Sequence, residues 1–276
     1  MHRRRPFTEA DTQDVGWRLR QLRTRRGLSL AKVAELSGKH TSQISRLERH
    51  SARYGDPKAS TVSELLDAMG VSPAERRAVF HVEASPLSQG EIEAQTRATA
   101  AEYANSRTPI GLIDDRWYRW YLNPASRAIM GLTDNEYEQL IGENVLVHLI
   151  NPASPLYGRY PDEDRRRIFS WRVAAFQFHY ADQQFDTWYL RVAHEIRRYY
   201  WAEQIWESPP DLPMFADNLV FPMIHPVEGK MLYRSQFNTI LKAPRFSLSE
   251  MTPADEPTRQ KMVQILAHLG SAEETA

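Results

Sequence analysis

The stretch that decides the fold of the first part of this chain runs from Leu28 to His50 and reads LSLAKVAELSGKHTSQISRLERH. It contains two short helical patterns, one on either side of Gly38. Ser29 suits the cap of the first helix, because a serine oxygen accepts a hydrogen bond from a free amide of the first turn. Gly38 stands where the chain must reverse, and glycine tolerates the positive φ that commonly ends a helix. We predict a helix, a tight turn and a second helix.

The second helix of this pair has an outer face of short hydrogen-bonding side chains and one arginine. Ile44 and Leu47 are predicted to face the core, as is the apolar side of the first helix, formed by Leu30, Val33, Ala34 and Leu36. The outward residues are Thr41, Ser42, Gln43, Ser45 and Arg46. A helix with such a face can lie in the major groove of DNA and contact base edges. The alternative is a helical hairpin within another kind of α domain.

The flanking segments weigh against that alternative, because they too have helical patterns. Upstream, a stripe of Val15, Leu19 and Leu22 lies among many arginines. Downstream, a stripe ends at Gly70 and is formed by Val62, Leu65, Leu66 and Met69. The run Ser72-Pro73-Ala74-Glu75 then has the form of a capping box with proline at the first helical position. These features predict five helices before residue 83.

This arrangement resembles the Xre family of bacterial repressors, whose helix-turn-helix ends in a run like Ser45-Arg46-Leu47-Glu48. The resemblance implies binding to double-stranded DNA, with Glu48 and Arg20 forming an internal ion pair that orients the second helix. The family often has a phosphate-contacting Gln where this chain has Leu30, so that contact is missing or replaced. Base contacts are expected from Thr41, Ser42, Gln43 and Ser45, and backbone contacts from Lys39, His40, Arg46, Arg49 and Lys58.

Charge is divided unevenly along the chain, although the formal net charge is zero. Residues 1–83 hold 16 Lys and Arg against 10 Asp and Glu, whereas residues 84–276 hold 19 against 25. A basic module is therefore joined to an acidic one, and a basic module is expected for phosphate contacts. Two interpretations of Arg3 to Arg5 stay open: an arm on the DNA backbone or minor groove, and a disordered terminus.

The sequence lacks the residues that several classes of protein function require. The chain has no cysteine, which excludes disulfides, thiol nucleophiles and cysteine-ligated metals. His194-Glu195 is not followed by the second histidine of a zinc motif, and glycine-rich phosphate loops are absent. Asp114-Asp115 has no partner base or nucleophile, so we expect no catalytic pair, no metal and no cofactor. Without a membrane-length apolar run or a signal peptide near Met1, we expect a bacterial cytoplasmic protein on the nucleoid.

The remainder of the chain predicts a second domain rich in aromatic residues. Residues 84–102 read as a linker, partly helical from Glu91 to Tyr103. Residues 103–237 hold 24 of the 29 Phe, Trp and Tyr residues, which must fill a core, an interface or a pocket. Strands are predicted at 110–115, 117–122, 219–225, 230–241 and 246–251. Helices are predicted to begin at Asn123 and to cover 162–180, 186–207 and 256–269.

The order of these elements resembles the MmyB-like ligand-binding domain, a PAS-like module joined to Xre-type domains. The match is carried by Asp115-Arg116-Trp117 to Asn123-Pro124-Ala125, by 144–152, by His225-Pro226-Val227-Glu228-Gly229 and by Thr252-Pro253-Ala254-Asp255. It implies an α+β chain, with an all-α five-helix domain at 1–83 and a PAS-like sensory domain at 103–276. It also implies a small apolar effector, with long-chain fatty acids as the candidate class.

Pocket-lining residues are expected among the first strands and the long aromatic helices. The candidates are Ile113, Trp117, Trp120, Ile129, Leu149, Phe176 and Phe178. The histidines His148, His179 and His225 are expected to be core or surface residues, and only a haem-binding variant would need one as a ligand. The favoured function is a homodimeric transcription regulator. Two alternatives stay open: a protein-interaction module beside the DNA-binding domain, and an enzyme that turns over an apolar substrate.

Overall fold

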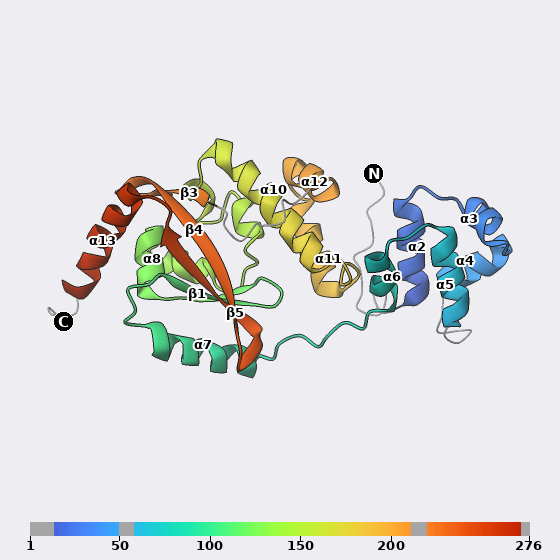
Figure 1. The fold of residues 1–276 in the computed structure, drawn as a ribbon, viewed down its shortest axis with the longest axis horizontal. Coiled ribbons are helices and arrows are strands. Elements are labelled where there is room, and N and C mark those ends of the chain that lie inside the picture. The colour runs from blue at the N-terminus through green and yellow to red at the C-terminus, as the bar shows by residue number, and fades with distance from the viewer. Residues whose placement is uncertain (1–13, 50–57, 211–219, 272–276) are drawn as a thin grey trace. The chain divides into compact units, whose positions relative to one another are not determined.

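The structure is a computed structural model that describes residues 14–49, 58–210 and 220–271. Its contacts divide the chain into two units: unit 1 comprises residues 1–85 and 177–191, and unit 2 comprises residues 86–176 and 192–276. Unit 1 is helical, and unit 2 combines helices with a five-stranded sheet (Figure 1). The chain is therefore α+β, as predicted. The domain boundaries at 83 and 102 stay predictions.

The five helices predicted before residue 83 are all present in unit 1. They are α2 (Val15–Arg25), α3 (Leu30–Ser37), α4 (Thr41–Arg49), α5 (Ala59–Ala68) and α6 (Pro73–Phe80). The predicted end signals act as expected: the Ser29 hydroxyl accepts from the Lys32 amide at 3.0 Å, and Gly38 has a φ of 67°. Ser72 and Glu75 form the capping box.

The core of unit 1 lies between these helices. Its buried side chains include Leu19, Leu22, Val33, Ile44, Val62, Leu65, Leu66 and Val79. The prediction for Leu36 is wrong, because this side chain is 48 % exposed. Helix α3 contacts α4 and α5 and buries only Val33 fully, so the face that it packs against them does not extend to Leu36.

Residues 177–191 also belong to unit 1, although they lie about one hundred positions further along the chain. Phe185 is completely buried in the helical core, and its ring meets Trp17 edge-on at 5.9 Å between ring centroids. The Arg25 guanidinium lies 5.2 Å from the centre of the same ring. The Thr187 amide donates to a Glu83 carboxylate oxygen at 2.8 Å. Sequence periodicity carries no signal of this pairing, since it depends on chain segments meeting in space.

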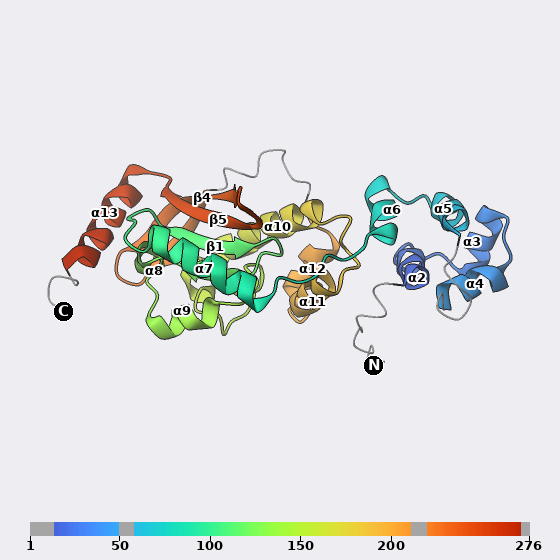
Figure 2. The same cartoon turned by 90° about the horizontal axis from the view of Figure 1, so that it is seen from below.

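Unit 2 is built on one antiparallel sheet with the strand order β2-β1-β5-β4-β3. The strands are β1 (Ile110–Asp114), β2 (Arg119–Leu122), β3 (Val220–His225), β4 (Gly229–Ile240) and β5 (Ala243–Pro253). Strands β4 and β5 have 12 and 11 residues, whereas β1 and β2 have five and four. Figure 2 shows β1, β5 and β4 side by side. The β1–β2 pairing is irregular between Leu112 and Ile113, so that Arg119 pairs with Ile113 and Tyr121 pairs with Leu112.

The remaining helices of the described chain lie before, between and after these strands in the sequence. They are α7 (Gln89–Tyr103), α8 (Pro124–Met130), α9 (Asp134–Leu140), α10 (Asp162–His179), α11 (Thr187–Ile196), α12 (Tyr200–Glu207) and α13 (Glu256–Ser271). Two short 3-10 turns, η1 (Val147–Leu149) and η2 (Tyr157–Arg159), precede α10. Helix α7 contacts β1 and β2, while α13 contacts α8, β4 and β5. Asn123 caps α8 as predicted, accepting from the Ser126 amide at 2.9 Å.

The single helix predicted over 186–207 is wrong, because the chain breaks it into α11 and α12. The amides of Arg198 and Tyr199 donate to carbonyls three residues back, at 3.2 and 3.1 Å, which tightens and ends α11. Arg197 then reaches Glu207 at 2.7 Å across the break. No proline or glycine marks this position, so the break comes from packing and not from local sequence.

Candidate DNA-binding interface and effector region

Helix α4 presents the outer face that the sequence predicts. Ile44 and Glu48 are 1 % and 7 % exposed, so they anchor the inner side. The exposed residues of α4 are Thr41, Ser42, Gln43, Arg46 and Arg49, with Ser45 half-buried between them. A row of short polar side chains and two arginines thus lies open on one helix, with both donors and acceptors for base edges.

The position of α4 against α2 depends on a glycine. Gly16 lies in the first turn of α2, where a Cβ atom would overlap the carbonyl oxygen of Leu47 on α4. Only glycine allows the two backbones to approach this closely. The Asp14 side chain caps α2 by accepting from the Gly16 amide at 2.7 Å, which fixes where that close contact begins.

The ion pair that holds α4 joins Glu48 to Arg23 and not to Arg20. Arg23 Nε and Nη2 donate to the two Glu48 carboxylate oxygens at 2.6 and 2.8 Å, and Nη1 donates to the Leu28 carbonyl at 2.8 Å. The bond to Glu48 raises the pKa of Arg23. Arg20 is exposed, because it lies on the side of α2 opposite Leu22, whereas Arg23 is one turn after the buried Leu19.

The cationic side chains predicted to contact the DNA backbone differ in their exposure and in their partners within the protein. His40 and Lys58 are exposed. The Lys39 ammonium lies 2.5 Å from Glu64 on α5, a partner that the sequence did not indicate. Arg49 Nε donates to the Ser45 carbonyl at 3.1 Å, which holds its side chain along α4. The predicted arm Arg3 to Arg5 lies outside the described residues.

In unit 2, a strained turn joins the first two strands. Trp117 has a φ of 66°, which is unusual for a residue other than glycine. Asp114 holds the turn: its carboxylate accepts from the amides of Arg116 and Tyr118 at 2.8 and 2.9 Å and from the Trp120 indole at 3.0 Å. Burial raises the pKa of Asp114 against the effect of these bonds.

An aromatic cluster surrounds this turn. Trp117 meets Phe176 edge-on at 5.4 Å and stacks on Phe237 at 6.2 Å, while Phe176 lies 6.0 Å from Trp206. The predicted lining residues Ile113, Ile129, Leu149 and Phe176 are buried, and Trp117 and Trp120 are half-buried. The prediction for Phe178 is wrong: it is 81 % exposed, because two positions along α10 turn it away from Phe176.

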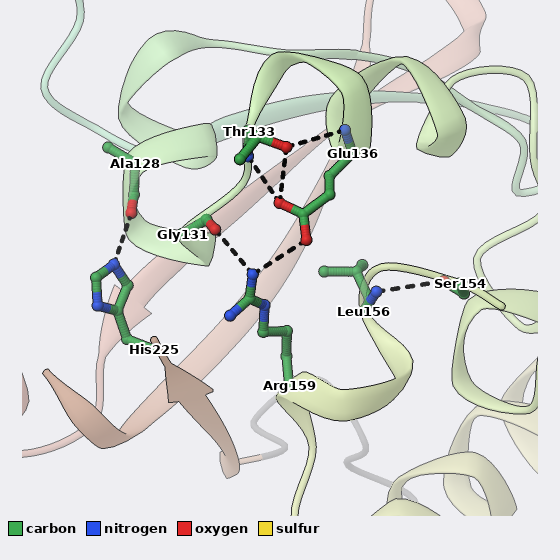
Figure 3. Close-up of polar contacts among 8 residues, drawn as sticks. All are labelled: Ala128, Gly131, Thr133, Glu136, Ser154, Leu156, Arg159 and His225. Atoms are coloured by element: carbon green, nitrogen blue, oxygen red, sulfur yellow. Dashed lines mark hydrogen bonds and ion pairs between the residues drawn. The ribbon is translucent and has the colours of Figure 1, made fainter. Parts of the chain in front are cut away.

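Two polar residues in unit 2 hold the end of α8 and the start of α9 (Figure 3). His225 Nδ1 accepts from the Glu228 amide at 3.1 Å, so its Nε2 carries the proton and donates to the Ala128 carbonyl at 3.1 Å. Arg159 donates to the Gly131 carbonyl at 2.9 Å and to Glu136 at 3.3 Å. These bonds give both side chains structural roles. Within the described ranges, no group of three or more His, Asp or Glu residues could hold a metal ion.

A buried cationic cluster in unit 2 was not predicted from the sequence. Arg119 on β2 and His148 on η1 are 8 % and 2 % exposed. Arg119 Nε, Arg119 Nη1 and His148 Nε2 are buried and have no hydrogen-bond partner among the residues that the structure describes. Burial lowers the pKa of Arg119 to about 10. Burial, then the charges of Arg119 and Arg172, lower the pKa of His148 to about 2.

Comparison with known proteins identifies the first part of the chain. A family model for a helix-turn-helix domain matches residues 14–79, the span of α2 to α6. This domain type points to a DNA-binding regulator. No curated protein matches the sequence. In the described part of the chain, no helix is long and apolar enough to cross a membrane.

Among solved structures, one similar chain is described as an RNA-binding light-oxygen-voltage receptor. The two share 13 % sequence identity with a TM-score of 0.29. The alignment covers 96 % of this chain but only 65 % of the receptor chain. A likeness of this degree supports no statement about fold or function.

Proposed function

We propose that the protein is a one-component transcription regulator that binds a specific DNA sequence through α4 and a small apolar effector through unit 2. The observation that carries the DNA-binding part is the exposed polar face of α4. The inner side of this helix is fixed by the close backbone contact at Gly16 and by the Arg23–Glu48 ion pair. A helix fixed on its inner side and polar on its outer side is suited to a major groove.

The proposed base contacts are made by Thr41, Ser42, Gln43 and Ser45. Gln43 is exposed and can pair bidentately with adenine, while Arg46 is suited to guanine or a phosphate. The test is selection of binding sites from a random duplex library by the full-length protein. A recovered motif, with the preference at one base pair lost in Gln43→Ala, supports this assignment. Glu35→Ala, an exposed change on α3, is the matched control. Recovery of no motif would overturn it.

We further propose that the protein acts as a homodimer. One recognition helix contacts few base pairs, so helix-turn-helix proteins commonly bind two half-sites about 34 Å apart. The aromatic unit 2 is the proposed source of the dimer contact. Light scattering on the full chain tests this proposal. A monomer at micromolar concentration, both free and on DNA, would contradict it.

The proposed effector is a small apolar molecule, with fatty acids as the candidate class. Support comes from the strand, turn, strand and Asn-Pro helix start of a PAS-like module, and from the aromatic cluster around Trp117. A ligand at a hundredfold excess over its Kd stabilises the folded state by about 2.7 kcal/mol. Thermal shifts of delipidated protein across acyl chain lengths test this. A flat response at every length, with no lipid released on denaturation, would exclude it.

Chain continuity supports coupling between effector and DNA. Residues 177–191 contribute Phe185 to the helical core of unit 1, and the chain enters and leaves this segment through α10 and α11 of the effector part. An effector that binds two arrangements of these helices with different affinity would therefore shift the balance between states of the DNA-binding unit.

A second candidate function is a protein-interaction module, and one observation favours it. Phe237 and Leu241, at and just after the end of β4, are 50 % and 95 % exposed, and Val263 on α13 is 63 % exposed. Apolar side chains in such numbers on a surface mark interaction sites when they are contiguous. Denaturing mass spectrometry of the purified protein separates the two functions. A co-purifying lipid favours the effector, whereas its absence together with a flat thermal-shift series favours the interaction module.

A further inference from the structure

The buried cationic cluster on β2, η1 and α10 is an unusual feature of unit 2. A guanidinium is charged at all working pH values and carries five N–H donors. Taking such a group out of water costs several kcal/mol unless an anion and hydrogen bonds replace the water. At Arg119, neither Nε nor Nη1 has an acceptor within residues 14–49, 58–210 and 220–271. Its nearby charged neighbour Arg172 is also a cation, which adds repulsion to the cost of burial.

The fold directs Arg119 inward through the irregularity in the β1–β2 pairing. In a regular strand, residues 119 and 122 would point to opposite faces. Here Arg119 pairs with Ile113 and Leu122 pairs with Gly111, two positions that share a face of β1. The extra residue in β2 therefore brings Arg119 to the same face as Leu122, which is 1 % exposed. Bulges of this kind commonly re-aim a side chain beside a functional site.

His148 Nε2 is a third buried nitrogen of the cluster, and it carries the ring proton when the Ser154 hydroxyl donates to Nδ1. The Ser154 hydroxyl accepts from the Leu156 amide at 3.3 Å, so its own hydrogen is free to reach His148 Nδ1 at 3.4 Å. With Nδ1 as acceptor, the proton of the neutral ring lies on Nε2. That Nε2–H is buried and has no acceptor, like the two nitrogens of Arg119.

Acids of the described residues do not neutralise this cluster. Glu143 lies 3.9 Å from His148 Nδ1, on the side of the ring away from the unpaired Nε2. Burial raises the pKa of Glu143, and its side chain remains 46 % exposed. The other nearby group is the Tyr160 hydroxyl, and a phenol is not a carboxylate counter-ion. The cluster thus has unpaired donors and a net positive charge, which is the chemistry that recognises an anion.

We propose that Arg119 and His148, with the charge of Arg172, bind the carboxylate of an amphipathic carboxylic acid effector. This rests on the proposed function, because it names the polar end of the apolar effector assigned to unit 2. A single negative charge matches the buried guanidinium of Arg119. The neighbouring side chains Phe221 and Tyr160 are buried and largely apolar, which suits a molecule with one charged end and an apolar body. Arg172 is half-buried and stacks near Phe221, so it connects the cluster to the surface.

The experiment compares decanoic acid with decanol, which share a chain length and differ in the headgroup. Binding to delipidated full-length protein is measured by calorimetry at pH 7.5. The acid is expected to bind at least tenfold more tightly than the alcohol, and Arg119→Met is expected to remove that preference. Arg119→Met should leave the unliganded fold as stable as before or more stable, since an unpaired buried cation is replaced by an apolar side chain.

If Arg119→Met folds poorly, other variants still test whether the cluster binds the carboxylate. Arg172→Met, at a half-buried position, should lower the acid preference without the core change, and Arg97→Met on the exposed side of α7 should not alter it. Asp211→Asn and Asp217→Asn test for a counter-ion within the chain. If either abolished folding that Arg119→Met restores, the effector site would be overturned.

The remaining outcomes separate this proposal from the proposed function. Equal affinity for acid and alcohol, unchanged in Arg119→Met, would overturn the carboxylate site and leave an apolar effector in place. Binding of neither compound, at this or any other chain length, would overturn the apolar effector and the carboxylate site together. An acid preference that survives both Arg119→Met and Arg172→Met would place the headgroup elsewhere.

Discussion

Replacing Phe185 with alanine tests whether the segment 177–191 is part of the DNA-binding unit. Phe185 is completely buried in the core of helices that otherwise come from residues 14–85. A buried phenylalanine removes roughly 150–250 Å² from water, worth about 4–6 kcal/mol at ~25 cal/mol per Å². Measured Phe→Ala changes in cores cost about 3–5 kcal/mol, because part of the cavity collapses. We therefore expect Phe185→Ala to destabilise unit 1 by about 4 kcal/mol.

Hydrogen exchange of the α2 amides is the assay, because it reports the opening of unit 1 separately from unit 2. Trp17 on α2 contacts the Phe185 ring directly, so protection of α2 is expected to fall about a thousandfold or more. Phe178→Ala is the matched control, since Phe178 lies in the same segment and is 81 % exposed. DNA affinity should fall in Phe185→Ala although Phe185 is not on α4. Equal α2 exchange in the two variants would refute the argument.

Three further predictions concern single residues. Gln43→Ala should weaken binding to the selected site by about 1–3 kcal/mol and reduce the sequence preference at one base pair. Arg49→Ala should weaken binding to all duplexes alike and reduce the slope of log affinity against log salt concentration by about one. Titrations on cognate and scrambled duplexes separate the two effects. In urea denaturation, Arg23→Ala should lower the free energy of unfolding by about 3–5 kcal/mol and Arg20→Ala by less than about 0.5 kcal/mol. The reverse order would show that Glu48 pairs with Arg20 and not with Arg23. The folded state holds the pKa of His148 at about 2, below its ordinary 6.5, so the unfolded chain gains the proton first as pH falls. Stability should therefore drop below pH 6.5, by up to about 1.4 kcal/mol per pH unit, and His148→Gln should show a flatter profile between pH 6.5 and 4.5.

Local signals in the sequence were sufficient for the helices of unit 1 and for the strand order along the chain. Ser29, Gly38 and the Ser72–Glu75 capping box act on backbone groups within three residues, so their effect does not depend on the rest of the fold. Asn123 caps α8 for the same reason. The polar face of α4 follows from the spacing of its residues alone, and a helix of that pattern has one side to bury.

Contacts between residues far apart in the sequence could be assigned only from the tertiary structure. The ion pair of Glu48 was predicted with Arg20, yet it forms with Arg23, because the rotation of α2 is set by packing and by the close contact at Gly16. Helix α10 turns Phe178 to solvent for a similar reason, since its inner face is chosen by the neighbouring elements.

The sequence by itself determined a helix-turn-helix unit with an exposed polar helix, joined to an aromatic α+β part, because periodicity and caps are properties of neighbouring residues. Only the tertiary structure brought Phe185 into the core of that unit and turned Arg119 inward at a bulge beside His148. The first depends on which distant segments meet, and the second on the register between two neighbouring strands. An arginine in a strand is indistinguishable from a solvent-exposed one until the pairing of that strand is known.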